Sequence, residues 1–183
     1  METYSLGRLI KSDLARLTDK KGLLAFLKWY FFPRGSTFPH DVWFRVLQRC
    51  KRSGLLKYTL GLFAYMMERH LSFKYDIHAN SNIPVGPGLQ IVHGSGVYLN
   101  CASVGSNVTV YQSVTFGTGR KNTETGLDIP TVENDVTVYP GAVIAGGITL
   151  HSGCVVAANS FVNCDVPPNS LVAGAPGRIV RQL

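Results

Sequence analysis

The sequence lacks the features that mark membrane-spanning and exported proteins. It contains no run of eighteen or more uncharged apolar residues, the minimum for a predicted transmembrane helix. Its N-terminus has neither the charged start, nor the apolar centre, nor the small-residue cleavage site of a signal peptide. We therefore expect a protein that remains in the cytoplasm.

Cysteine is scarce, with four in 183 residues. None of them forms the C-x-x-C spacing of a zinc site or a redox pair, and a disulfide framework would need a denser pattern. We expect all four to be reduced thiols, namely Cys50, Cys101, Cys154 and Cys164. No bound metal is expected.

Acidic residues are also few, 11 against 18 Lys and Arg, for a net charge of +7. Residues 1–75 hold 14 basic and 5 acidic residues, a net of +9, whereas residues 76–183 hold 4 and 6, a net of −2. The basic residues lie in helical patterns without a nucleic-acid-binding motif or an aromatic stacking platform. We expect no nucleic-acid partner.

A six-residue repeat is the most informative feature that the sequence does contain. Aliphatic residues recur at every sixth position from 132 to 162: Val132, Val138, Ile144, Leu150, Val156 and Val162. Small or aliphatic residues follow each of them by four positions: Val136, Ala142, Ile148, Cys154, Ser160 and Val166. This period fits a triangular coil with six residues per side and not a helix of 3.6 residues per turn. It predicts a mainly β fold, a parallel β-solenoid.

An earlier stretch has the same period, and an insertion separates it from the later one. Its members are Val92, Tyr98, Val104, Val110 and Phe116, while Ile77, Ile83 and Leu89 continue it upstream with a phase shift of three residues. Sixteen residues separate Phe116 from Val132 where twelve would keep the phase, so we expect four residues to loop out. The extended loop 117–131 is polar and Gly-rich, and such loops on rigid scaffolds often bind ligands. A tolerated surface insertion is the alternative.

Residues 1–75 have the apolar spacing of helices and are rich in aromatic and basic side chains. We therefore divide the chain into this α-helical region and a β-solenoid over 76–183, which carries the loop and a C-terminal tail. The aromatic and basic residues predict a peripheral membrane contact through residues 28–52, at the inner face of the membrane. In the alternative interpretation, the aromatic rings cover the open end of the solenoid and the cations are solvated.

His93 is the candidate for acid–base chemistry. The apolar residues before it place it on the solenoid wall, and Gly94-Ser95-Gly96 follow as a turn of small residues. Asp76 and His78 precede it by about one coil, so we expect them to lie close to it. A carboxylate on one imidazole nitrogen fixes the tautomer and raises the basicity of the other nitrogen, as a general base requires. A histidine in a turn can also be purely structural.

Several motifs together resemble those of the hexapeptide-repeat acyltransferases, specifically the serine acetyltransferase branch. They are Tyr75-Asp76-Ile77-His78, His93-Gly94, the run from Gln112 to Gly117, and the close from Pro167 to Pro176. The likeness extends from about Lys74 to Val180. It implies a left-handed parallel β-helix preceded by a short α-helical segment, a homotrimer with active sites in the clefts between neighbours, and acetyl-CoA as donor.

The resemblance also implies roles for individual residues. His93 matches the catalytic histidine and Asp76 its carboxylate partner, although their separation of 17 residues is two more than expected. His93 would take the proton of an acceptor hydroxyl as it attacks the thioester, and a backbone N–H near Gly117 would stabilise the oxyanion. The positions implied for binding acetyl-CoA are Gly117, Thr118, Ala158, Asn163, Arg178 and Arg181.

The chain departs from the serine enzymes at two positions that would hold the amino acid. Val92 stands where those enzymes have an aspartate before the catalytic histidine, and Asp128-Ile129 replaces an arginine–histidine pair. These departures predict an acetyltransferase for a sugar hydroxyl in capsular or exopolysaccharide biosynthesis. The alternatives are a serine O-acetyltransferase of cysteine biosynthesis and a non-catalytic β-helix assembly module.

Overall fold

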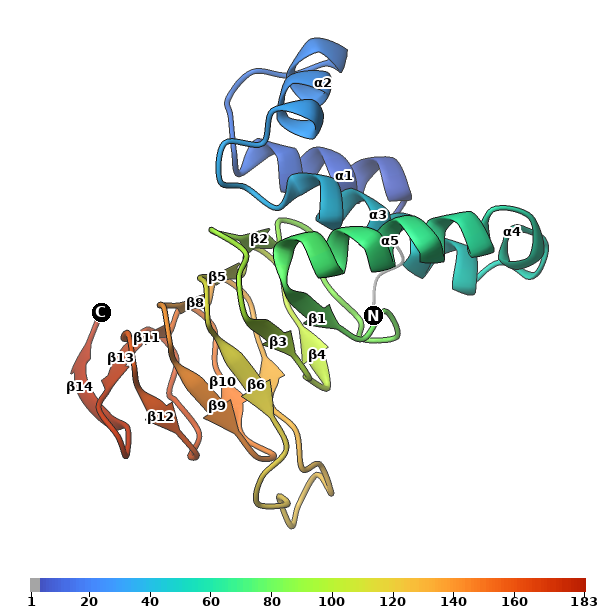
Figure 1. Cartoon of the computed structure of the whole chain (residues 1–183). Coiled ribbons are helices and arrows are strands. Elements are labelled where there is room, and N and C mark those ends of the chain that lie inside the picture. The colour runs from blue at the N-terminus through green and yellow to red at the C-terminus, as the bar shows by residue number, and fades with distance from the viewer. Residues whose placement is uncertain (1–3) are drawn as a thin grey trace.

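The structure, a computed structural model, describes residues 4–183 as a group of helices that leads into a stack of short strands (Figure 1). The helices are α1 (Leu6–Ala15), α2 (Leu23–Phe31), α3 (Phe38–Lys51), α4 (Gly54–Thr59) and α5 (Gly61–Tyr75). Ser5 and Ser53 cap α1 and α4 by accepting hydrogen bonds from backbone N–H groups of the first turn. Asp76 ends α5 in the left-handed conformation, and the first strand begins at the next residue.

The strands form three sheets, one for each side of a triangular coil. The five-stranded sheet has the order β1 (Ile77–Ala79), β3 (Val97–Leu99), β6 (Thr115–Gly117), β9 (Val143–Ala145), β12 (Phe161–Val162). The three-stranded sheet has the order β10 (Thr149–Leu150), β7 (Thr131–Val132), β4 (Ser103–Val104). The six-stranded sheet has the order β14 (Arg178–Gln182), β13 (Ser170–Ala173), β11 (Val155–Val156), β8 (Thr137–Val138), β5 (Thr109–Val110), β2 (Gln90–Ile91). The predicted parallel β-solenoid is therefore confirmed.

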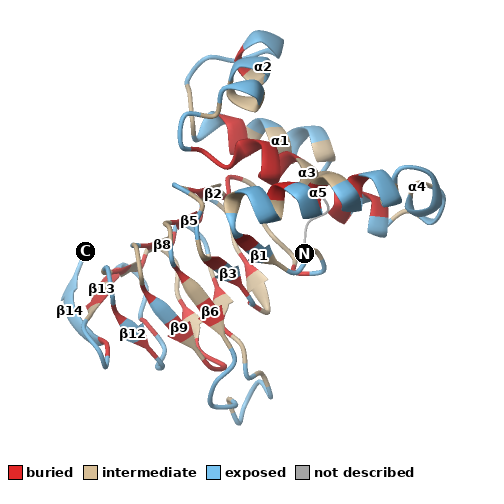
Figure 2. Cartoon of the chain, in the orientation of Figure 1, coloured by how far each residue is buried: buried red, intermediate tan, exposed pale blue. Residues whose placement is uncertain are grey.

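The interior of the coil is filled by the repeating aliphatic residues. In the six-stranded sheet Val110 pairs with Val138, which pairs with Val156, and each is completely buried (Figure 2). All twelve positions of the two later series are buried, from Val132 to Val166. Cys154 is one of them, and the four cysteines are free thiols.

The predicted phase is wrong in the first coil. Tyr98 is 46% exposed and Val92 is only partly buried, while Ile91 and Val97 take the core positions. The reason is the length of this coil: residue 97 pairs with residue 77, a separation of 20 residues instead of the 18 between residues 137 and 155. The additional residues shift which side chains point inward.

The extended loop between β6 and β7 holds more residues than predicted. Residue 109 pairs with residue 137, a separation of 28 residues, so the loop adds ten residues to an 18-residue coil and not four. The earlier count placed positions 116 and 132 two sides of the triangle apart, whereas β6 and β7 lie on adjacent sides. Hydrogen bonds within the loop, such as that from the Gly119 N–H to the Asp128 carbonyl, give it a defined shape.

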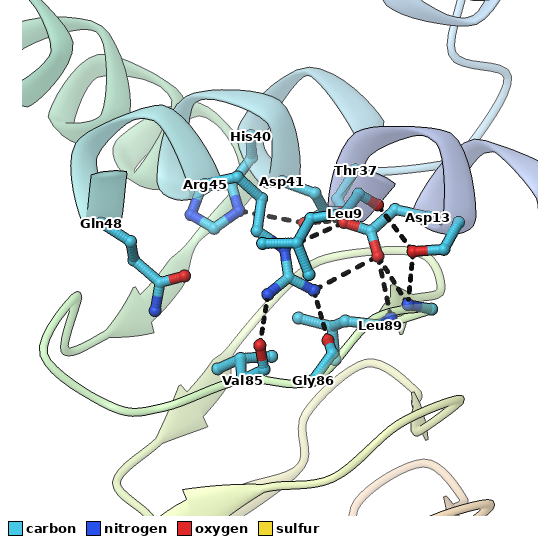
Figure 3. Close-up of polar contacts among 12 residues, drawn as sticks. Leu9, Asp13, Thr37, His40, Asp41, Arg45, Gln48, Val85, Gly86 and Leu89 are labelled. Atoms are coloured by element: carbon cyan, nitrogen blue, oxygen red, sulfur yellow. Dashed lines mark hydrogen bonds and ion pairs between the residues drawn. The ribbon is translucent and has the colours of Figure 1, made fainter. Parts of the chain in front are cut away.

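A buried ion pair joins the helices to the first coil (Figure 3). The Arg45 guanidinium of α3 donates two hydrogen bonds to the Asp13 carboxylate of α1, at 3.0 and 3.2 Å. It also donates to the carbonyls of Val85 and Gly86, at 2.7 and 2.6 Å. Burial raises the pKa of Asp13 to about 6 despite the opposing effect of Arg45. The helical group is thus anchored to the solenoid by charge as well as by apolar contact.

Within residues 28–52, the structure contradicts the predicted membrane contact at the residues of α3. Phe44 and Arg45 are buried, and Trp43 is partly buried against Phe63 with ring centroids 5.3 Å apart. These side chains face the interior because they connect α3 to α1, α5 and the first coil. Across residues 4–183, none of the helices combines the length and the apolarity that crossing a bilayer requires.

Candidate active site

His93 lies in the turn between β2 and β3, where the coil passes from the six-stranded to the five-stranded sheet. Its backbone has a positive φ of 53°, a conformation that costs a residue other than glycine free energy and must be held by its neighbours. The His93 N–H donates to the Gly35 carbonyl at 3.0 Å, and Val92 forms an antiparallel bridge with Ser36. The segment before α3 therefore holds the turn.

The His93 side chain is exposed, and within residues 4–183 its ring makes no hydrogen bond or ion pair. Its ring lies against Gly35, where an added Cβ would come within 3.1 Å of Nδ1. The imidazole can thus receive a proton from a molecule in solution. A second group to fix its tautomer has to come from outside the described chain.

Asp76 does not bind His93, in contrast to the predicted pairing. Its Oδ1 lies 3.2 Å from Nε2 of His78, and its Oδ2 accepts the Gly96 N–H at 2.8 Å. The 20-residue first coil is the cause, because it aligns Asp76 with Gly96, three residues beyond His93. The catalytic roles of Asp76 and His93 remain predictions.

His78 is a second imidazole candidate with a defined environment. It stacks on Tyr98 with ring centroids 4.5 Å apart, and its ion pair with Asp76 is about half exposed. A cavity of about 650 Å³ between α5 and the five-stranded sheet is lined by His78, Tyr98, Gly117 and Thr118. The sequence motif Asp-Ile-His contained this pair, but only the structure shows the two side chains in contact.

The positions implied for acetyl-CoA do not meet in one cavity of a single chain. Gly117 ends β6, at the opposite edge of the five-stranded sheet from the turn that carries His93. Ala158 is exposed in the turn after β11, three strand spacings from the His93 turn, or about 14 Å at the usual spacing. Exposed residues near the last coil complete the set: Asn163, Arg178 and Arg181.

Cys101 is unsuited to a nucleophilic role. It is 3% exposed, and burial raises the pKa of its thiol far above the ordinary value. Reactive cysteines require the thiolate, which this environment disfavours. The geometry therefore supports direct transfer without a covalent intermediate on this residue. Among the described residues, no three His, Cys, Asp or Glu side chains gather as metal ligands would.

Comparisons with known proteins show relatives of a single kind. The serine acetyltransferase of Bacillus licheniformis is 42% identical over 109 residues, 58% of this chain and 48% of its own length. That of Bacillus subtilis is 36% identical over 130 residues (70% and 58%), and that of Staphylococcus xylosus is 34% identical over 145 residues (78% and 64%). The chain thus spans about half to two thirds of these curated relatives. No protein-family model matches it.

Solved structures with the same fold are also serine acetyltransferases. That of Vibrio cholerae superposes with a TM-score of 0.75 at 21% identity, over 97% of this chain and 66% of the other. That of Neisseria gonorrhoeae in complex with serine has a TM-score of 0.74 at 26% identity, over 96% and 69%. The soybean apoenzyme has a TM-score of 0.75 at 25% identity, over 96% and 69%.

The fold is therefore a left-handed parallel β-helix preceded by a short α-helical segment. The chain belongs to the hexapeptide-repeat acyltransferases, in their serine acetyltransferase-like branch. The expectation of a sugar hydroxyl as acceptor in polysaccharide biosynthesis is wrong, because the relatives are serine acetyltransferases. That expectation depended on Val92 and Asp128-Ile129, and these few positions outweighed the similarity of more than 100 others.

Proposed function

We propose that the protein transfers the acetyl group of acetyl-CoA to the hydroxyl of L-serine, a step of cysteine biosynthesis. The observation that supports this most is the identity of 34–42% to serine acetyltransferases across the β-helix and part of the helical region. Two structural neighbours add to it, one with bound serine and one with bound CoA. The catalytic function of this chain follows from its own exposed groups.

His93 acts as the general base in this proposal. Its exposed imidazole removes the serine hydroxyl proton as the oxygen attacks the thioester carbonyl, and CoA leaves as the thiol. A backbone N–H near Gly117 stabilises the oxyanion that forms on that carbonyl. Since a positioned base contributes about 10²–10⁴-fold to a rate, removal of the imidazole costs that much in kcat.

The reaction needs two copies of the chain, and we propose a homotrimer. His93 and Gly117 are at opposite edges of one sheet, so a neighbouring molecule has to bring its own Gly117 and Thr118 to His93. An exposed column along the outer face of the five-stranded sheet supports lateral association: Tyr98, Val143 and Phe161, at 46, 37 and 38% exposed. The groove between two solenoids then accommodates the pantetheine arm, with Ala158 and Asn163 along it and the arginines of β14 near the phosphates.

The assay follows free thiol released from acetyl-CoA, with L-serine, L-alanine or a panel of sugars as acceptor. We expect release with serine only, because alanine has no hydroxyl. His93→Gln should abolish it, whereas His78→Gln should reduce it less than about tenfold, since His78 is already engaged with Asp76. Absence of serine-dependent release would contradict the proposed function, and the reverse order of the two variants would assign the base to His78.

Sedimentation tests the trimer independently of activity. Phe161→Glu places a charge in the middle of the exposed column, and we expect it to yield monomers with the same circular dichroism as the wild type. Lys57→Glu is a matched control on the exposed surface of α4. A wild-type protein that sediments as a monomer would rule out the shared site.

We also propose a narrower form of the predicted membrane contact, through α2 and the residue after it. Large apolar side chains are exposed there: Leu23, Leu24, Phe31 and Phe32, at 70, 84, 64 and 70%. Lys28 is exposed on the same helix, and this combination suits an anionic lipid surface. Cosedimentation with anionic vesicles tests it: the wild type should bind and Leu24→Glu should not. Equal recovery of both proteins would contradict the contact.

A further inference from the structure

The helical region does more at the His93 turn than cover the end of the solenoid. The segment before α3 runs antiparallel to the turn, through the Ser36–Val92 bridge and the hydrogen bond from the His93 N–H to the Gly35 carbonyl. Gly94 follows at a point of close contact, where an added Cβ would clash with the Thr37 methyl group. The residues on both sides of His93 are thus fixed by contacts with residues 35–37.

Thr37 is the link between this turn and the helices. Its side chain is completely buried, and its hydroxyl lies 3.1 Å from the Ile91 carbonyl and 3.2 Å from Oδ2 of Asp41. A hydroxyl has one proton to donate, so the two acceptors compete for it unless Asp41 carries a proton of its own. Ile91 is two residues before His93, and this contact therefore sets the start of the turn.

Behind Thr37 lies a row of buried polar groups that the proposed reaction does not use directly (Figure 3). His40 Nδ1 is 3.3 Å from Oδ1 of Asp41, and His40 Nε2 is 3.8 Å from Oε1 of Glu68 on α5. Nε2 is buried without a hydrogen-bond partner. His40, Asp41 and Glu68 are 1, 5 and 7% exposed. Since burying such groups costs free energy, an apolar core here would be more stable.

We propose that Thr37, Asp41 and His40 are positioning residues for the catalytic histidine, which rests on the proposed function of His93 as the base. The row runs from α5 through α3 to the Ile91 carbonyl and holds the strained His93 backbone in place. A displacement of about 1 Å in a reacting group can cost about 100-fold in rate, so a small movement of this turn is measurable. The row also explains how the helices contribute to a site located on the solenoid.

The test replaces the hydroxyl without changing the shape of the side chain. Thr37→Val removes the donor, Thr37→Ser keeps it, and Thr59→Val is the matched control, because the Thr59 hydroxyl only bonds to Leu55 of its own exposed helix. We expect Thr37→Val to lower kcat at least about tenfold with an unchanged KM for acetyl-CoA, and Thr37→Ser to restore kcat to within about threefold. Thr59→Val should equal the wild type. An unchanged kcat in Thr37→Val would overturn the proposal.

A second readout does not depend on activity. Amide hydrogen exchange of the His93 N–H, measured by NMR, should be at least about tenfold faster in Thr37→Val, while strands β8 and β11 keep their protection. If the wild type acetylates no serine, the proposed function fails, and this exchange rate still decides whether Thr37 holds the turn. If Thr37→Val does not fold, Asp41→Asn takes its place with the same readouts. Unchanged His93 exchange in the folded variant would overturn the proposal.

Discussion

Replacement of Arg45 by methionine should destabilise the protein far more than any exposed charge replacement. The guanidinium makes four hydrogen bonds, two to Asp13 and one each to the Val85 and Gly86 carbonyls. Arg45→Met leaves the Asp13 carboxylate buried without its cation, which costs about 3–5 kcal/mol. For a chain of this size, 1 kcal/mol corresponds to about 2–4 °C in Tm. We therefore expect Tm to fall by about 6–20 °C.

The measurement is thermal unfolding followed by far-ultraviolet circular dichroism, with Arg49→Met as control. Arg49 is on the same helix one turn later and is exposed, so its replacement should change stability by less than about 0.5 kcal/mol. Adding Asp13→Leu to Arg45→Met should recover part of the loss, because both buried charges are then gone. If Arg45→Met melts within 2 °C of Arg49→Met, roughly the smallest shift that 1 kcal/mol produces, the ion pair does not anchor the helices.

Three further predictions concern pH, packing and close backbone contacts. The pKa of Asp13 is raised to about 6 by burial, so the folded state binds its proton more tightly than the unfolded state; the free energy of unfolding should fall as pH rises from about 4 to about 6, and this slope should vanish in Asp13→Asn. Leu150→Ala, at a completely buried position, should cost about 2–5 kcal/mol in urea unfolding, against less than about 0.5 kcal/mol for Leu24→Ala at 84% exposure. Gly105→Ala would put a Cβ within 2.5 Å of the next coil's backbone and should lower Tm, whereas Gly7→Ala, with open space around it, should raise it slightly.

The six-residue period was sufficient to predict the solenoid, because every inward position of a triangular coil must be apolar and recurs at a fixed interval. It failed at Val92 and Tyr98, where the first coil is 20 residues long. A period read from the sequence shows neither where additional residues enter a turn nor which side chains they turn outward. The same two-residue excess separates Asp76 from His93, so their predicted contact failed for the same physical reason.

The buried polar groups could not be identified from the sequence. Arg45 and Asp41 have the helical spacing of ordinary surface charges, and only the contact of α3 with the first coil makes them interior residues. Thr37 precedes a helix and resembles any capping residue, yet it caps nothing and bonds to Ile91, 54 residues away. Long-range contacts of this kind decide burial, and a local pattern contains no information about them. The acceptor was misjudged for a related reason, since two local positions were weighed above the likeness of the whole β-helix.

The last strand has a consequence for aggregation. Open-ended parallel solenoids present unpaired backbone groups on which further strands of other molecules can add, and fibres grow in that way. Here β14 turns back and pairs antiparallel with β13, with a register shift between Leu171 and Val172. All five of its residues are exposed, and two are arginines that repel an identical edge. At the other end, α3 and α5 pack over the first coil (Figure 1). Polymerisation along the solenoid axis is thereby blocked in both directions, and copies of the chain can associate only side by side.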